Sequence, residues 1–287
     1  MRQYWLGSVL ILLGAAVFSA GCGDAPAAGS DGDSERLVLF VGSASQPPTE
    51  LAARRFEEKT GASLDLHFGG SGEMLSRMEL SGRGDIYFPG SSDYMEIARR
   101  RGLVDPDTER IAAYLVPAIN VPKGNPNGIE TLEDLAQSGV RVGIARPDTV
   151  CVGLYAVEVL EANGLADRVR PNIVTHAESC AKTAQIVALS QVDAVLGWEV
   201  FEHWDSESIE TIYLSPEEVP RIGYIPAAIG ANSAAPELAE AFLDFLVSPE
   251  GQDIFRQWNY LTTVEEARAH TAPDTPVGGE WPLPAGW

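Results

Sequence analysis

Hydrophobic and polar residues alternate along the chain with two periods, one typical of strands and the other of helices. Residues 37–41 form an apolar run, and residues 49–60 have apolar side chains at helical spacing. Apolar and polar residues alternate in 63–68 until Gly69 and Gly70 interrupt the pattern. The first part of the folded chain is therefore predicted to run strand, helix, strand.

The same alternation continues to residue 258. It predicts strands at 85–88, 115–121, 140–145, 172–175, 193–197 and near 222–229, and helices from about 73 and at 92–101, 131–137, 152–163, 179–190, 236–247 and 249–258. Such alternation favours parallel sheets with helices on both faces, so the expected fold class is α/β. The Pro- and Gly-rich tail at 271–287 is predicted to be irregular, with Trp281 and Trp287 outside the folded body.

The N-terminal segment has the pattern of a bacterial lipoprotein signal. Arg2 supplies a positive charge, residues 5–18 are apolar and uncharged, and small residues lead into Cys22. As a helix the apolar run would span roughly 21 Å, which is short of the roughly 30 Å of a bilayer core. We expect a signal peptide at 1–21 and lipid on Cys22. The alternative is an ordinary secreted protein that is cut nearby and keeps Cys22 as a free thiol.

Residues 22–35 are mostly Gly, Ala, Ser, Asp and Pro, which predicts a flexible tether between the lipid and the folded part. No other segment is apolar enough to span a bilayer. The folded part is therefore expected outside the cytoplasm, in the periplasm or at the cell surface, with the lipid anchor as its one membrane contact.

Composition narrows the choice of partner. The chain has 287 residues, of which 45% are hydrophobic and 21% are charged. This length and this hydrophobic content are enough for two packed domains. Its formal charge of -21 makes nucleic acid an unsuitable partner. The same charge repels small anions at long range, but salt screens that field beyond about 8 Å, so local donors can still hold an anion.

Four strand-to-helix turns share a design. They lie at 41–45, 69–72, 146–153 and 177–180, and the first two place Ser and Gly where a helix begins. Gly permits close backbone approach, Ser supplies a hydroxyl, and a helix N-terminus presents unpaired N–H groups. One such turn is more often a simple helix cap, but four at the carboxyl ends of strands predict an anion site without Lys or Arg.

Five segments in order along the chain are similar to one known family. They are FGGSGEML at 68–75, GDIYF at 84–88, VGLYA at 152–156, DAVLGW at 193–198 and FLDFLVSPEG at 242–251. From residue 37 to about 258 the chain resembles the molybdate-binding proteins of ABC transporters. These are receptors of the type II periplasmic binding protein fold, whose two lobes close on a tetrahedral oxyanion.

The resemblance implies a function and a division of the chain. Lobe 1 would comprise 36–117 and 226–270, and lobe 2 would comprise 118–225. The protein would be a monomeric solute-binding component of an ABC importer that hands a small oxyanion, such as molybdate or tungstate, to permease subunits. It would be no enzyme and would need no cofactor or metal. The residues contain neither a nucleophile elbow nor a Walker loop.

The resemblance also implies ligand-binding residues. The family's first serine falls at Ala44, which lies between Ser43 and Ser45, and its second falls on Ser71. Its two backbone donors in lobe 2 fall on Val152 and Cys180, beside Cys151, and its tyrosine hydroxyl falls on Trp198. Unlike tyrosine, Trp198 can donate a hydrogen bond but cannot accept one.

Placed by this resemblance, Cys151 and Cys180 lie on facing turns of one cleft. Outside the cytoplasm such a pair often oxidises, so one hypothesis is a disulfide. The other is a pair of thiols that binds a thiophilic metalloid oxyanion or a soft metal, in an importer component or a stand-alone sensor. A redox enzyme is less favoured because the pair lacks the Cys-x-x-Cys arrangement. The ligand stays open among molybdate, tungstate, sulfate-like anions and thiol-seeking species.

Overall fold

The computed structural model describes residues 36–287, which fold around two five-stranded sheets. The expected signal peptide, the lipidation residue Cys22 and the tether lie outside the described residues. Within residues 36–287 no helix combines the length and the apolarity needed to cross a bilayer.

The ten strands alternate with helices over most of the described chain. The strands are β1 (Arg36–Gly42), β2 (Ser63–Gly69), β3 (Ile86–Phe88), β4 (Arg110–Leu115), β5 (Pro117–Pro122), β6 (Val142–Ala145), β7 (Ile173–Ala177), β8 (Ala194–Trp198), β9 (Ile209–Tyr213) and β10 (Gly223–Ile229). The α-helices are α1 (Gln46–Thr60), α2 (Ser71–Ser81), α3 (Ser92–Arg100), α4 (Cys151–Ala162), α5 (Ala166–Val169), α6 (Cys180–Ala188), α7 (Phe201–Trp204), α8 (Pro236–Val247), α9 (Pro249–Gln257) and α10 (Val264–Arg268). The 3-10 helices are η1 (Ser43–Ser45), η2 (Pro106–Thr108), η3 (Glu133–Ala136), η4 (Arg170–Asn172) and η5 (Pro216–Glu218).

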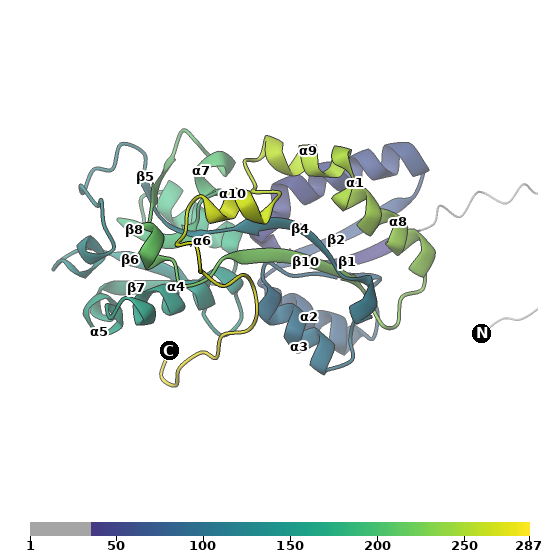
Figure 1. The fold of residues 1–287 in the computed structure, drawn as a ribbon, viewed down its shortest axis with the longest axis horizontal. Helices are drawn as coiled ribbons and strands as arrows, with labels where there is room; N and C mark the ends of the chain where they lie inside the picture. The colour runs from purple at the N-terminus through teal and green to yellow at the C-terminus, as the bar shows by residue number, and fades with distance from the viewer. Residues whose placement is uncertain (1–35) are drawn as a thin grey trace, which may run out of the picture. The chain divides into compact units, whose positions relative to one another are not determined.

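The first sheet has the order β2-β1-β3-β10-β4. Strands β1, β2 and β3 are parallel, with Leu39 opposite Ile86 and Phe40 opposite His67, whereas β10 is antiparallel to both β3 and β4. Helices α1, α8 and α9 cover one face of this sheet and α2 and α3 cover the other (Figure 1). We call these elements lobe 1.

The second sheet has the order β7-β6-β8-β5-β9. Strands β6, β7 and β8 are parallel, and β5 is antiparallel to β8 and β9. Helix α4 packs on one face and α6 on the other, and their apolar contacts explain why these helices form where the pattern predicts. We call these elements lobe 2.

The α/β fold class is confirmed, but both sheets are mixed rather than parallel. The predicted strand at 115–121 is two strands, because β4 belongs to the first sheet and β5 to the second and they meet at Val116. The chain passes between the sheets there without a helix, and β5 pairs with antiparallel neighbours instead of making a parallel crossover. The helix predicted at 131–137 is only the 3-10 turn η3.

The C-terminal tail is irregular, as predicted, but the prediction that its tryptophans lie outside the body is wrong. Trp281, Leu283 and Trp287 pack against the apolar core of lobe 2. The Trp287 indole N–H donates to Glu161 over 2.7 Å, and the Arg170 guanidinium lies 4.5 Å from the Trp287 ring centroid. The aromatic side chains of this segment hold it to the surface of lobe 2 without regular secondary structure.

Candidate functional site

The predicted ligand-binding residues follow the carboxyl ends of strands, at the boundary between the lobes. Each lies where a strand gives way to a helix or at a strand's last residue. Ser43 and Ser45 form η1 after β1, Ser71 opens α2, Cys151 and Val152 open α4, Cys180 opens α6, and Trp198 ends β8. Each of these seven residues is at most 2% exposed, so the structure brings them into a buried region.

The two lobes touch directly at these turns. The Ala181 backbone N–H of lobe 2 donates to the Ser43 hydroxyl of lobe 1 over 3.3 Å. The Gly72 backbone N–H of lobe 1 donates to the Thr149 carbonyl of lobe 2 over 2.8 Å. This is the contact expected of a receptor whose lobes have closed, and the seven predicted residues at these turns are buried.

The serines of lobe 1 are not equivalent. The Ser45 hydroxyl accepts from the Thr49 hydroxyl over 3.1 Å, a contact within the first turn of α1. The Ser71 hydroxyl accepts from the Gly90 backbone N–H over 3.0 Å, so its own proton can be donated to a ligand oxygen. The Ser71 carbonyl accepts from the Tyr87 hydroxyl over 2.8 Å, which holds the start of α2 in place.

Sequence reasoning missed Gly90, which lies at the centre of these contacts. A Cβ atom added to Gly90 would lie 2.5 Å from the Cys151 sulfur, 2.6 Å from the Ala44 Cβ and 3.6 Å from the Ser71 hydroxyl oxygen. Only glycine lets both lobes approach this point. The signal was present in Gly90-Ser91-Ser92, a further strand-to-helix turn of the same composition as those singled out.

Cys151 and Cys180 are free thiols in this structure, with their sulfur atoms 3.5 Å apart. A disulfide bond is about 2.05 Å long, so the pair predicted as a possible disulfide is adjacent but not bonded. Burial raises the pKa of the Cys180 thiol, and the neighbouring Cys151 raises it further, whereas the Val152 backbone N–H and the Trp198 side chain act in the opposite direction.

Two buried donors beside the thiols have no partner among the described residues. The Trp198 indole stacks edge-on against the Tyr155 ring with centroids 4.8 Å apart. The Tyr155 hydroxyl meets no acceptor, and the Trp198 N–H meets none at hydrogen-bonding geometry although it lies close enough to affect Cys180. Since an unpaired buried polar group costs about 1 to 3 kcal/mol, these donors are suited to a ligand.

Glu199 adds a buried acid next to Trp198. Its Oε2 accepts from the Val116 backbone N–H over 2.9 Å, and its Oε1 has no partner among the described residues. Burial raises the pKa of this carboxyl to about 8, so it is largely neutral at pH 7. Near the turns predicted to bind an anion, Glu199 therefore adds little negative charge. Within residues 36–287 no group of three or more His, Cys, Asp or Glu side chains could hold a metal ion.

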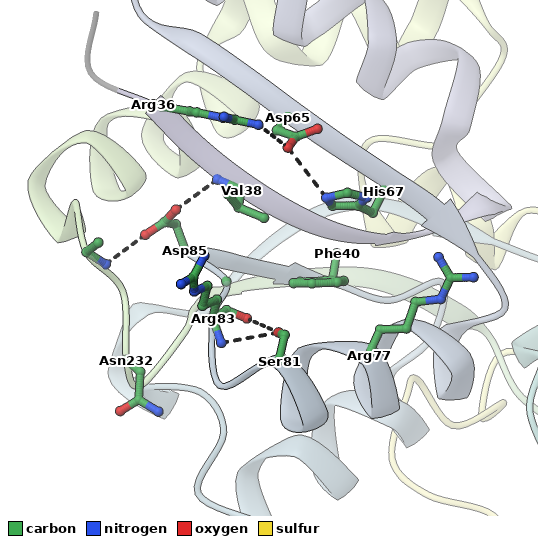
Figure 2. A pocket seen from close by; sticks show the side chains of 12 residues that line it. Arg36, Val38, Phe40, Asp65, His67, Arg77, Ser81, Arg83, Asp85 and Asn232 are labelled. Atoms are coloured by element: carbon green, nitrogen blue, oxygen red, sulfur yellow. Dashed lines mark hydrogen bonds and ion pairs between the residues drawn. The ribbon is translucent and has the colours of Figure 1, made fainter. Parts of the chain in front are cut away.

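Two surface hollows lie outside this buried region. One of about 670 Å³ lies on lobe 1 between the β1–β2 end of the sheet and α2, and none of the predicted ligand-binding residues lines it. Figure 2 shows how some of its charged side chains lie: Arg36 and His67 both face Asp65, and Asp85 accepts from the Val38 backbone N–H over 2.8 Å.

A second hollow, of about 500 Å³, lies at the lobe boundary. It is lined by Gln46, Pro47, Glu50, Arg54 and Trp258 of lobe 1 and by Ala181 and Trp204 of lobe 2. Gln46 and Ala181 directly follow Ser45 and Cys180 in the chain. The hollow therefore lies immediately outside the buried turns.

Comparison with known proteins adds a family to this geometry. The model of the family described as bacterial extracellular solute-binding protein matches residues 37–261. A binding protein of Haemophilus influenzae is 26% identical over 232 residues, covering 78% of this chain and 90% of that protein. The molybdate-binding protein ModA of Rhodobacter capsulatus is 22% identical over 229 residues, covering 79% of this chain and 88% of that protein.

Solved structures share the fold. The periplasmic molybdate-binding protein of Azotobacter vinelandii superposes with a TM-score of 0.69 at 19% identity, covering 80% of this chain and 99% of that one. Proteins described as binding sulfate, thiamin and iron match with TM-scores of 0.71, 0.68 and 0.61. The two-lobed fold of type II periplasmic binding proteins is thus confirmed, but fold alone does not select the ligand.

Proposed function

Because the chain belongs to the family of bacterial extracellular solute-binding proteins, we propose that it captures a tetrahedral oxyanion such as molybdate or tungstate between its two lobes. The observation that carries the proposal is the meeting of three helix N-termini in one buried region. Helices α2, α4 and α6 begin at Ser71, Cys151 and Cys180, and each has at least nine residues. The first-turn N–H groups that remain beside the bonded ones of Gly72 and Ala181 can together stabilise an anion.

Local donors account for anion binding by so acidic a protein. The Ser71 hydroxyl and the backbone N–H groups that open α4 and α6 supply hydrogen bonds without a compensating cation. The relatives named as molybdate-binding proteins support this choice of ligand. The predicted ligand-binding residues include no Lys or Arg, which favours an anion that needs only hydrogen-bond donors over one that needs an Arg fork.

Capture rather than catalysis would be the mechanism. A ligand held by residues of both lobes favours the closed form, and the permease of an ABC importer would recognise that closure. The protein would act as a monomer outside the cytoplasm. We further propose that lipid on Cys22 attaches it to a membrane and that residues 22–35 give it reach to the permease.

A thermal-unfolding panel tests the function. Sodium molybdate, tungstate, sulfate and phosphate are each added to the purified protein with and without reductant, with chloride at equal ionic strength as the control. At a hundredfold excess over Kd a ligand adds about 2.7 kcal/mol of stability. Stabilisation by molybdate or tungstate in both redox conditions supports the proposal. If no oxyanion raises the midpoint above the chloride control, the proposal fails.

A further inference from the structure

Oxyanion binding does not explain why two cysteine thiols meet in the buried region. Cys151 and Cys180 open two different helices, yet their sulfur atoms meet 3.5 Å apart, and each residue is only 1% exposed. A thiol is a weak hydrogen-bond donor, so two of them contribute little to holding oxygen atoms. A pair of thiols at the lobe boundary is, by contrast, a good ligand for soft elements.

The sulfur separation selects among soft ligands. With thiolate bonds of about 2.3 Å, two sulfurs about 3.5 Å apart subtend roughly 100° at a shared central atom. A linear two-coordinate metal would need a separation of about 4.6 Å at the same bond length. The observed spacing therefore suits a pyramidal or tetrahedral centre and not a linear one.

The number of further donor atoms that the central atom needs distinguishes a pyramidal centre from a tetrahedral one. A tetrahedral metal bound by two thiolates needs two more donors, but the described residues hold no group of three His, Cys, Asp or Glu side chains that could bind one. The coordination of a trivalent metalloid is complete with two sulfur atoms and one hydroxyl group. It would also enter as a neutral hydroxide, which the overall charge of -21 does not repel or attract.

We propose that Cys151 and Cys180 together bind a trivalent, thiophilic metalloid hydroxide such as arsenous acid, As(OH)3. The inference rests on the proposed function only in placing a ligand between the lobes. Two As–S bonds form while two As–O bonds break. Each thiol proton leaves with a hydroxyl group as water, and no electrons are transferred. The remaining As–OH oxygen can accept from the Trp198 indole N–H, which has no partner among the described residues.

Arsenite binding to defined cysteine variants tests the proposal. All variants carry Cys22→Ser, so Cys151 and Cys180 are the only thiols left in the chain. Sodium arsenite is titrated calorimetrically into the reduced parent protein, Cys151→Ser, Cys180→Ser and the double variant. The parent is expected to bind one arsenite per chain. Either single variant should bind at least about 100-fold more weakly, because the chelate is lost.

A second measurement needs no substitution in the pair. Arsenite should protect both thiols of the parent from alkylation, so that mass spectrometry finds both cysteines unmodified. An excess of a competing dithiol should remove that protection. The inference is overturned if the reduced parent binds no arsenite, or if the double serine variant binds it as tightly. Molybdate is titrated separately into the same parent: failure there contradicts the oxyanion function alone, and failure with arsenite contradicts the dithiol site alone.

Discussion

At the scale of single residues, Gly90 and Ser71 explain how the two lobes meet. Gly90 lies between Ala44 of lobe 1 and Cys151 of lobe 2, at distances where an added Cβ atom would collide with both. Its backbone N–H in turn occupies an acceptor position of the Ser71 hydroxyl. The hydroxyl is thereby oriented, and its proton stays free for donation to the proposed ligand.

Ser71→Ala should weaken molybdate binding without unfolding the protein. The substitution removes a donor to the ligand and leaves the Gly90 N–H unpaired, for an expected loss of about 1 to 3 kcal/mol in binding. Calorimetry measures the affinity. Ser76→Ala, also on α2 but exposed, is the matched control. An affinity equal to that of the control would remove Ser71 from the binding region.

Glu199 should make the stability of the protein depend on pH. The folded carboxyl has a pKa of about 8, above its ordinary value of 4.5, so the folded state binds more protons between those two pH values. Stability from this group is complete below about pH 4.5 and is lost as pH rises through 8.

Glu199→Gln cannot ionise and should remove that loss. Relative to wild type, its free energy of unfolding should rise by roughly 3 to 5 kcal/mol between pH 5 and pH 9. Denaturant unfolding at pH 5, 7 and 9 measures the difference, with exposed Glu207→Gln controlling for the lost charge. Parallel pH profiles for wild type and Glu199→Gln would show that the buried carboxyl does not titrate as expected.

At the scale of elements, the three helix N-termini differ in how they are capped. The Ser179 hydroxyl accepts from the Lys182 backbone N–H over 3.2 Å and caps α6, the helix that Cys180 opens. The start of α2 instead relies on tertiary contacts, because Gly70 provides no side-chain cap. The two helices should therefore respond differently to local substitution.

Ser179→Ala should lower the free energy of unfolding by about 1 kcal/mol, because one N–H of the first turn loses its acceptor. Ser190→Ala, just beyond the other end of α6, has no such capping contact and serves as the control. Urea unfolding of both variants measures the difference. Equal stability of the two would mean that the cap contributes nothing to α6.

Most elements of both lobes could be predicted from hydrophobic periodicity, because α4 and α6 bury apolar residues on either face of one sheet. Strand β9 was missed, since it lies at an edge and only Ile209 of its five residues is fully buried. The antiparallel pairing of β5 and β10 could not be predicted either. Strand direction depends on partners far along the chain, which local pattern does not encode.

The candidate ligand-binding region was predictable in its turns but not in its contacts. Ser, Gly and helix-start patterns locate Ser71, Cys151 and Cys180 along the chain. The 3.5 Å approach of the two sulfurs and the position of Gly90 between the lobes arise only when two separate sheets come together. Residues that touch across a lobe boundary leave no periodic signal in either lobe.

At the scale of the whole described molecule, a buried ion network joins the lobes. The Arg221 guanidinium lies between Asp93 of α3 in lobe 1, at 3.1 Å, and Glu158 of α4 in lobe 2, at 2.7 Å. It also lies 4.2 Å from the Tyr155 ring centroid and donates to the Gly279 carbonyl of the C-terminal tail over 2.9 Å. All three charged residues are at most 5% exposed.

Arg221→Met should shift the ligand-free protein toward an open form. It leaves two buried carboxylates facing each other, and breaking a buried pair costs about 3 to 5 kcal/mol. A larger radius of gyration by small-angle scattering and roughly tenfold or more weaker molybdate binding are expected. Arg141→Met, which removes an exposed ion pair within lobe 2, is the control. A radius and affinity equal to those of the control would show that the network does not stabilise closure.

The most direct test of oxyanion capture is a crystal structure of the reduced protein with tungstate, located by the anomalous signal of tungsten. The account predicts one strong peak between the lobes, within hydrogen-bonding distance of the Ser71 hydroxyl and of the backbone N–H groups that open α4 and α6. A closed structure with no peak there, or with tungsten bound elsewhere, would contradict it.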